Sequence, residues 1–294
     1  MSTRENTEGT ERTERGERFE AFRALHHGSR PLVLPNAWDH ASASALVARG
    51  FAAVATTSLG VAAALGRLDG QGGMRDDTVA LARRLTRLPA LVTVDAEGGY
   101  SDDPDDVAAL AVELAAAGVV GMNLEDGRSD GTLTDLGFHC AAIGAVKRAV
   151  PDMFVNARTD AFWLGTADGT ADATPDGRPL DEVLRRGAAF VAAGADGVFV
   201  PGLDDDAAIR TVVGEVAAPV NILFNPARHT YGRLADLGVA RISCGSLLFR
   251  TALHSAVELA WSIAEDAYDA GQAASGVPDY AETQALADAF AETS

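Results

Sequence analysis

The chain has 294 residues, with 24 Lys or Arg against 42 Asp or Glu and a formal net charge of −18. This acidic balance argues against a nucleic-acid or anionic-membrane partner, because both would repel the protein. The 2 cysteines, Cys140 and Cys244, do not make a disulfide framework, so a reduced, cytoplasmic setting is expected.

Residues 1–18 alternate charges with Ser, Thr and Gly and contain no apolar residue beyond Met1. Such a segment cannot bury enough surface to offset its ordering entropy, so we expect a disordered tail. It lacks the apolar core of a signal peptide. No run of about 18 apolar residues follows, so the sequence predicts a soluble protein with no membrane partner.

From Pro31 onward, short apolar runs alternate with longer stretches that have helical spacing. Continuous apolar runs are typical of parallel strands that are covered on both faces. Eight such runs occur: Pro31–Pro35, Ala52–Thr57, Leu91–Val94, Val119–Leu124, Met153–Ala157, Gly197–Val200, Val220–Phe224 and Arg241–Cys244.

The segments between the runs repeat one helical design. Residues 105–117 and 181–193 each carry an apolar stripe and end at Ala-Gly just before the next run. This repeat predicts an α/β fold, a (β/α)8 barrel, over residues 19–270. Residues 271–294 are expected to form a linker and an additional helix, whose apolar face needs a partner.

Polar residues follow most of the strands, at the end where barrel enzymes place their active sites. Asp95 and Glu97 flank Ala96, so they point to one side of an extended strand, and Glu125 ends the next run. Carboxylates that converge in this way require a cation, and an all-oxygen set suits Mg²⁺ or Mn²⁺. The alternative is that such residues only cap helices or lie at the barrel rim.

Arg158 ends another strand, where a guanidinium can bind a substrate carboxylate through two hydrogen bonds. An ion pair with Asp160 or Glu125 is the alternative. Asn225 follows the Val220–Phe224 run and is a further candidate for substrate binding. Lys147, the single lysine, excludes a P-loop by its Val-Lys-Arg context and is predicted to be a solvated helix residue.

In their order and spacing, five segments resemble the isocitrate lyase/phosphoenolpyruvate mutase superfamily from about Phe22 to Ala264. They are the run from LPNAWDHASAS to GRLDG, then VDAEGGYSDD, GMNLEDG, NARTDAF and AAGADGVFVPG. The resemblance implies a (β/α)8 barrel that binds Mg²⁺ and an α-oxo-carboxylate and works through a pyruvate-like enolate. It also implies a homo-oligomer, a dimer or a tetramer, in which a C-terminal helix is exchanged between barrels.

Carried over by position, Asp95 matches the aspartate that contacts the metal, whereas Asp69, Glu97 and Glu125 match carboxylates that hold its waters. Glu97 departs from the commoner aspartate, so it could shift or ligate the ion directly. Arg158 matches the arginine that binds the substrate carboxylate. The residues implied around the substrate's oxygens are Ser58, Leu59 and Gly60.

The gating loop, residues 127–139, departs from the family pattern. It lacks the Lys-Lys/Arg-Cys-Gly-His motif of the lyases and the asparagine of the phosphonomutases, and Cys140 is more simply a packing residue. Its His139, with Asp130 and Tyr100, is a candidate base for retro-aldol cleavage, although a lone histidine here is more often a surface residue. Leu164–Pro179 is expected to be either a lid or a tolerated insertion.

The sequence therefore predicts a Mg²⁺-dependent lyase that cleaves a C–C bond of an α-oxo- or α-hydroxy-carboxylate, by decarboxylation of an oxaloacetate-like substrate or by retro-aldol cleavage. The alternatives are P–C chemistry, as a mutase or a phosphonopyruvate hydrolase, and a non-catalytic barrel that binds a dicarboxylate. The catalytic candidates are Asp69, Glu125, His139 and Arg158.

Overall fold

A computed structural model describes residues 2–167, 179–268 and 276–291 of the chain. Within these ranges the strands form one parallel sheet in the order β1-β9-β8-β7-β6-β5-β4-β3-β2. They are β1 (Leu32–Leu34), β2 (Asn36–Ala37), β3 (Ala53–Thr56), β4 (Leu91–Asp95), β5 (Gly121–Glu125), β6 (Phe154–Arg158), β7 (Gly197–Val200), β8 (Val220–Leu223) and β9 (Arg241–Ser243).

The sheet closes because β1 and β2 are two parts of one extended segment, interrupted at Pro35, which has no amide hydrogen to donate. β1 pairs with β9 and β2 pairs with β3, so the segment joins both edges of the sheet. Asn36 reinforces this closure. Its Oδ1 accepts the amides of Cys244 and Gly245 at 2.9 and 2.8 Å, and its Nδ2 donates to the Thr56 carbonyl at 2.7 Å. The predicted (β/α)8 barrel is confirmed.

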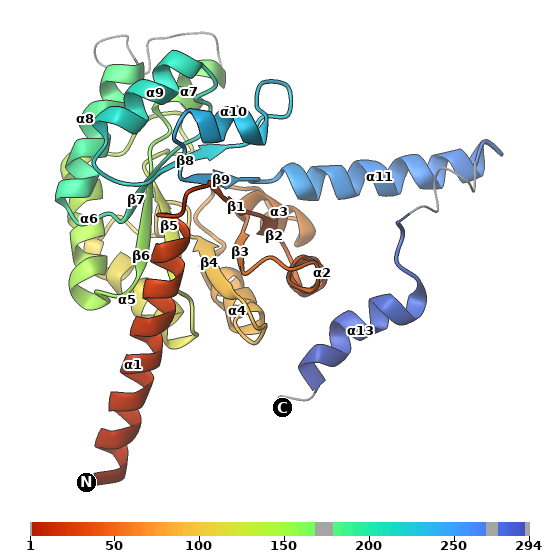
Figure 1. Cartoon of the computed structure of the whole chain (residues 1–294), viewed down its shortest axis with the longest axis horizontal. Coiled ribbons are helices and arrows are strands. Elements are labelled where there is room, and N and C mark those ends of the chain that lie inside the picture. Colours follow the sequence, from red (N-terminus) through yellow and green to blue (C-terminus); the bar gives the residue numbers. More distant parts are fainter. Residues whose placement is uncertain (1, 168–178, 269–275, 292–294) are drawn as a thin grey trace.

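Helices surround the barrel (Figure 1) and bury apolar stripes against its strands. Those between strands are α2 (His40–Ala48), α3 (Ser58–Ala64), α4 (Arg75–Leu85), α5 (Pro104–Ala116), α6 (Leu136–Ala149), α7 (Ala161–Ala167), α8 (Pro179–Ala192), α9 (Asp206–Glu215) and α10 (Tyr231–Asp236). The prediction of a lid or an insertion at Leu164–Pro179 falls largely on residues 168–178, which lie outside the described residues.

The N-terminal segment, for which the sequence suggests a disordered tail over residues 1–18, forms part of helix α1. This helix covers Ser2–Leu25 (Figure 1). Its second half is held on the barrel, because Arg15 pairs with Asp152 at 2.7 Å and Phe22 is fully buried. The Phe22 ring meets Phe154 of β6 edge to face at 5.2 Å. The apolar anchor lies just beyond the charged run, so the composition of residues 1–18 did not reveal it.

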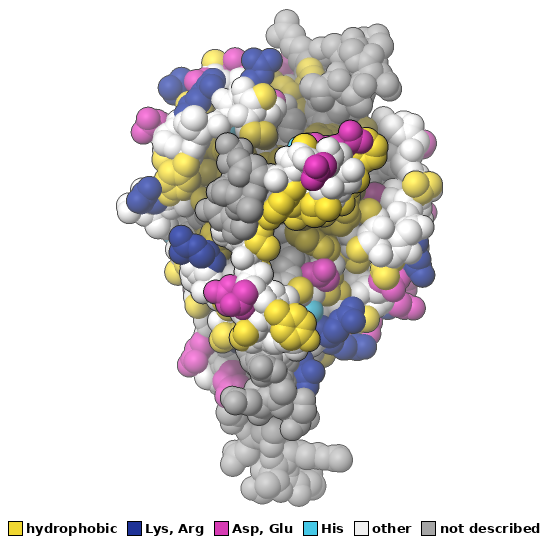
Figure 2. Space-filling view, turned by 90° about the vertical axis from the view of Figure 1, so that its right-hand side faces the viewer, with side chains coloured by type: hydrophobic (Ala, Val, Ile, Leu, Met, Phe, Trp, Pro, Cys, Tyr) yellow, Lys and Arg dark blue, Asp and Glu magenta, His cyan; other side chains and the backbone are white. Residues whose placement is uncertain are grey.

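The C-terminal part contains α11 (Leu247–Ala264), which projects from the barrel, and α13 (Tyr280–Ala291). Leu253, Val257 and Trp261 recur every four residues along α11 and are 52%, 63% and 65% exposed. Figure 2 faces this side of the molecule and shows hydrophobic side chains gathered there. No helix in the described ranges is both long and apolar enough to cross a bilayer.

Candidate active site

A cavity of about 520 Å³ opens at the carboxyl ends of the strands. Its wall combines acidic side chains, one strand-end arginine and a rim of aromatic and small residues. The residues that line it are Asp69, Gly70, Gln71, Gly72, Glu97, Gly98, Tyr100, Ser101, Asp102, Glu125, Gly127, Arg128, Ser129, Thr134, Phe138, Arg158, Asp160, Trp163 and Leu164.

Three of the four proposed metal residues, Asp69, Glu97 and Glu125, line this cavity. Asp95 is not among the lining residues, but it is close enough for its charge to act on all three. The Asp95 carboxylate accepts the Ser58 amide at 3.2 Å through Oδ2. The charge of Asp95 raises the pKa of Asp69, Glu97 and Glu125, although desolvation is the larger cause in each case. The structure therefore brings together the carboxylates that the sequence places on different strands and loops.

Glu97 lines the cavity and, after Glu125, has the most strongly shifted pKa of this group. Its side chain is buried, and desolvation, followed by the charges of Asp69 and Asp95, raises its pKa to about 7. Its backbone has φ 48°, a left-handed conformation that is rare outside glycine and costs stability. Strain of this kind is commonly retained where a side chain must be aimed at a site.

Arg158 is held by two carboxylates. Its Nη1 lies 2.5 Å from Glu125 Oε2, and its Nε and Nη2 donate to the two oxygens of Asp160 at 2.6 and 2.9 Å. These charges raise the pKa of Arg158, so the guanidinium is permanently charged. Both ion pairs that the sequence left as alternatives are present, and Arg158 still lines the cavity.

The segment Ser58–Gly60 is the first turn of α3 rather than a free loop. The Ser58 amide is used by Asp95, and the Ser58 hydroxyl bonds to Asp69. A Cβ on Gly60 would meet Thr57 and Trp38 at 2.8 and 2.9 Å, so this glycine is required for packing. Ser58 therefore positions carboxylates of the site.

Two predicted site residues lie elsewhere. His139 is 2% exposed, packs beside Phe190 at 4.7 Å and bonds to the Leu124 carbonyl, so it is a core residue rather than a surface residue. Burial lowers its pKa to about 3, which leaves the ring neutral. Asn225 Nδ2 donates to Asp204 at 2.7 Å, and neither His139 nor Asn225 lines the cavity.

The other two candidate bases are also poorly suited. Asp130 is exposed and accepts two hydrogen bonds from Thr132, which lower its pKa. Tyr100 lines the cavity, but burial and the charge of Glu97 raise its pKa, so it remains a neutral phenol bonded to Thr78 at 3.0 Å. Tyr100 is therefore a hydrogen-bonding group and not a base.

Lys147 is not the solvated helix residue that the sequence predicts. It is largely buried, with its Nζ 2.9 Å from Asp196 and 2.8 Å from the Met153 carbonyl. The lysine therefore ties α6 to the loop before β7 and the end of the loop before β6. Cys140 packs at the margin of the core, as expected.

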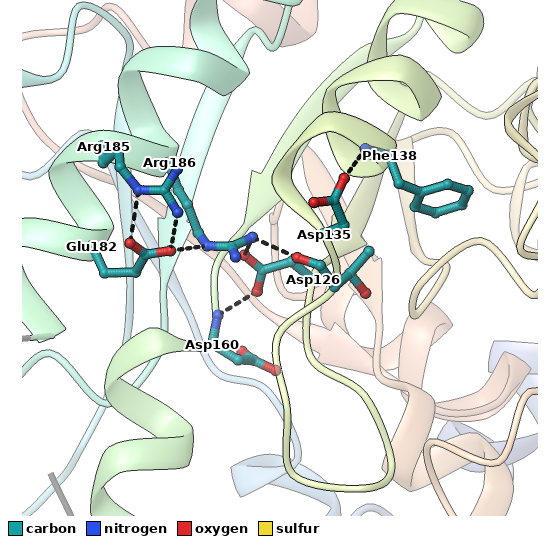
Figure 3. Close-up of polar contacts among 8 residues, drawn as sticks. Asp126, Asp135, Phe138, Asp160, Glu182, Arg185 and Arg186 are labelled. Atoms are coloured by element: carbon teal, nitrogen blue, oxygen red, sulfur yellow. Dashed lines mark hydrogen bonds and ion pairs between the residues drawn. The ribbon is translucent and has the colours of Figure 1, made fainter. Parts of the chain in front are cut away.

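A buried ionic network lies behind the cavity (Figure 3). Arg186 of α8 donates to Asp126 at 3.1 Å and to Glu182 at 2.6 Å. Asp126 follows Glu125 directly and is fully buried, and desolvation raises its pKa to about 6 against the opposing effect of Arg186. No strand-end pattern in the sequence indicates this network, because Arg186 lies within helix α8 and not at the end of a strand.

The donor set fits a hard divalent cation. Asp95 Oδ1 and Glu97 Oε1 are buried and have no hydrogen-bond partner in the described part of the chain. Among the same residues no group of three or more His, Cys, Asp or Glu is arranged to hold an ion by itself. Mg²⁺ often keeps several waters and takes only one or two carboxylates directly, which agrees with this arrangement.

Comparison with known proteins identifies the family. Residues 22–264 match the family model described as phosphoenolpyruvate phosphomutase. The chain belongs to the phosphoenolpyruvate phosphomutase family. An uncharacterized protein of Mycobacterium tuberculosis is 40% identical over 262 residues, which cover 89% of this chain and 93% of that protein.

Other members of the phosphoenolpyruvate mutase/isocitrate lyase superfamily differ in their reactions. Oxaloacetate decarboxylase of Ectopseudomonas mendocina is 32% identical over 183 residues, which cover 58% of this chain and 57% of that enzyme. A Burkholderia cenocepacia protein described as a candidate phosphonomutase has a solved structure with a TM-score of 0.77 and 38% identity, covering 84% of this chain and 99% of that one. The superfamily thus fixes the scaffold and leaves the reaction to the site.

Proposed function

We propose that this chain is a Mg²⁺- or Mn²⁺-dependent lyase that cleaves a C–C bond next to an α-oxo- or α-hydroxy-carboxylate through a pyruvate-like enolate. Decarboxylation of an oxaloacetate-like substrate is the simplest such reaction. One observation carries the proposal: within the described residues Asp95 Oδ1 and Glu97 Oε1 have no hydrogen-bond partner, and both carboxylates lie near the charged Arg158 guanidinium, which lines the same cavity as Glu97. A cation and a carboxylate would each find a complementary group there.

In this proposal the carboxylates of the site bind the cation and the arginine binds the substrate. Asp95 and Glu97 would hold the ion directly or through water, and Asp69 and Glu125 would orient its waters. A bound Mg²⁺ would supply Lewis-acid stabilisation of negative charge on the substrate's oxo oxygen. Arg158 would bind the substrate carboxylate and fix its orientation, because Asp160 already sets the plane of the guanidinium.

The placement of the candidate bases favours decarboxylation over retro-aldol cleavage. Retro-aldol cleavage needs a group to take the substrate's hydroxyl proton. His139 is in the core, Asp130 is bonded to Thr132 at an exposed loop tip, and Tyr100 is a neutral phenol. Loss of CO₂ needs no such proton transfer, and the relatives named oxaloacetate decarboxylase support this choice.

P–C chemistry is the second candidate, because the family model carries the phosphomutase description and the 38% identical structure is described as a candidate phosphonomutase. The loop between Gly127 and His139 contains no asparagine, however.

A homo-oligomer that covers the apolar stripe of α11 is also part of the proposal.

The test is an NMR screen of the purified protein with Mg²⁺ against oxaloacetate, phosphonopyruvate, 2-methylisocitrate and alkylmalates. We expect pyruvate from oxaloacetate, no activity after chelation, and loss of activity in Asp95→Asn. Asp102→Asn at the exposed mouth is the matched control and should remain active. Turnover of phosphonopyruvate alone would favour the second candidate. A wild-type protein that shows no Mg²⁺ binding by calorimetry would contradict both and leave a non-catalytic barrel.

A further inference from the structure

The buried network around Arg186 is more extensive than packing of α8 requires. Arg186 is 5% exposed, and its Nε already pairs with Glu182, one turn earlier on the same helix, at 2.6 Å. Arg185 pairs with Glu182 as well. The remaining donors of Arg186 leave the helix and reach the segment that follows β5.

This segment is a short hairpin, residues 127–133, whose two ends meet at Arg186. Arg186 Nη1 donates to Asp126 Oδ2 at 3.1 Å and to the Thr134 carbonyl at 2.9 Å. The Thr134 amide donates to the Asp126 carbonyl at 2.7 Å, and Gly127 and Leu133 form an antiparallel bridge. Arg128 and Ser129, at the exposed end of this hairpin, line the cavity.

Asp126 is also connected through hydrogen bonds to Arg158, the proposed substrate-binding arginine. Asp126 Oδ1 accepts the Asp160 amide at 2.8 Å, and the Asp126 amide donates to the Arg158 carbonyl at 3.1 Å. The Asp160 side chain in turn binds the Arg158 guanidinium at two points. Figure 3 shows Asp126 between Arg186 and the Asp160 amide.

We propose that Arg186 is a positioning residue for carboxylate binding: through Asp126 it fixes the backbone of Asp160 and the base of the 127–133 hairpin, and thereby the orientation of Arg158. This inference rests on the proposed function, in which Arg158 binds the substrate carboxylate. Arginine suits the role because its planar fork donates in several fixed directions at once, whereas lysine is a point charge on a flexible stem. A charge that only neutralised Asp126 could be supplied by either residue.

The test uses oxalate as a probe dicarboxylate, titrated by calorimetry in the presence of saturating Mg²⁺. We expect Arg186→Lys and Arg186→Gln to weaken oxalate binding by about tenfold or more. Binding of Mg²⁺ alone should change little, because Asp95 and Glu97 belong to β4 and the loop that follows it. Arg185→Gln, which removes a Glu182 pair on the same turn, is the matched control and should bind oxalate like the wild type.

Hydrogen exchange supplies a readout that does not depend on a ligand. The amides of Asp160 and Thr134 should exchange faster in both Arg186 variants and unchanged in Arg185→Gln. Wild-type oxalate affinity in Arg186→Lys, or unchanged exchange at both amides, would overturn the inference. An equal loss of Mg²⁺ affinity would overturn it too, since that indicates general damage. A wild-type protein that binds Mg²⁺ but no oxalate would instead contradict the proposed function, and exchange would still decide whether Arg186 fixes the hairpin.

Discussion

Glu125 and Arg158 are partners in the β5–β6 register, and their side chains form an ion pair of 2.5 Å at the carboxyl ends of the two strands. In the proposed function Glu125 orients waters of the cation and Arg158 binds the substrate carboxylate, so these two proposed groups are already in contact without a ligand. A substrate carboxylate would then share Arg158 with Glu125 and Asp160, which would lower its affinity but fix its orientation. Desolvation raises the pKa of Glu125, and Arg158 opposes this shift.

Arg158→Gln tests how much of the fold depends on this arrangement. The variant leaves the buried carboxylates of Glu125 and Asp160 without their shared counterion, which costs about 3–5 kcal/mol in comparable buried pairs. We expect a loss of that order in the free energy of unfolding by urea, and no detectable oxalate binding. Arg83→Gln, which breaks an exposed pair with Glu113, is the control and should be nearly neutral. If Arg158→Gln and Arg83→Gln lost the same free energy of unfolding, Arg158 would not be the counterion that stabilises the buried Glu125 and Asp160 carboxylates.

A substitution at Gly127 tests whether the position of the Asp160 carboxylate matters for the site. A Cβ at this position would overlap the Asp160 carboxylate, so Gly127→Ala must displace a group that holds Arg158. Overpacking of this kind typically costs about 1–3 kcal/mol. We expect weaker oxalate binding with intact Mg²⁺ binding, both measured by calorimetry. Gly98→Ala is the matched control, because its nearest neighbour, the Glu125 carbonyl, is 3.7 Å away. Similar losses in both variants would refute the specific role of Gly127.

The barrel and its carboxylates could be predicted because they depend on local signals. Apolar runs ended by polar residues mark strands whose ends meet, and Glu97 and Glu125 indeed line one cavity. Glu97 reaches it from a left-handed residue after β4, however, and not from the extended strand that the sequence suggested. The resemblance to a family added Asp69, which lies in a loop with no such signal. The order of the strands and loops in the chain brings these residues to the site, whichever side chains pack beside them.

The parts that sequence reasoning missed depend on long-range packing. Whether His139 faces the cavity or the core is decided by the rotation of α6, and its Phe190 neighbour is 51 positions away. Arg241 is a stronger case: it is fully buried in the barrel and donates to Ser243 at 3.1 Å and Asn123 at 3.4 Å. Nothing in its strand, Arg-Ile-Ser-Cys, indicates that its charge points inward.

The buried histidines predict a pH dependence of stability. Burial lowers the pKa of His139 and of His26 to about 3, whereas each has an unfolded pKa of about 6.5. Between these values each histidine binds more protons in the unfolded state, so the histidine contribution to the free energy of unfolding decreases as pH falls below about 6.5. Glu97 and Asp126, whose folded pKa values are raised to about 7 and about 6, contribute with the opposite sign. Each histidine contributes a slope of up to about 1.4 kcal/mol per pH unit.

Urea unfolding between pH 7 and pH 5 measures this slope. His139→Gln keeps a donor for the Leu124 carbonyl and should make the slope of stability against pH less positive than in the wild type, even where it lowers stability at pH 7. A slope that is identical in His139→Gln and the wild type would show that this ring does not titrate on unfolding.

The apolar stripe of α11 predicts self-association. Leu253, Val257 and Trp261 are each more than half exposed on a helix that projects from the barrel. A contiguous apolar face of this kind marks an interface, and a second copy of the chain is the proposed partner. Trp261→Glu places a charge in the stripe and should reduce the mass measured by light scattering. Ser255→Glu, on the opposite side of α11, should leave the mass unchanged. A wild-type protein that remains monomeric at tens of micromolar concentration would refute the proposed oligomer.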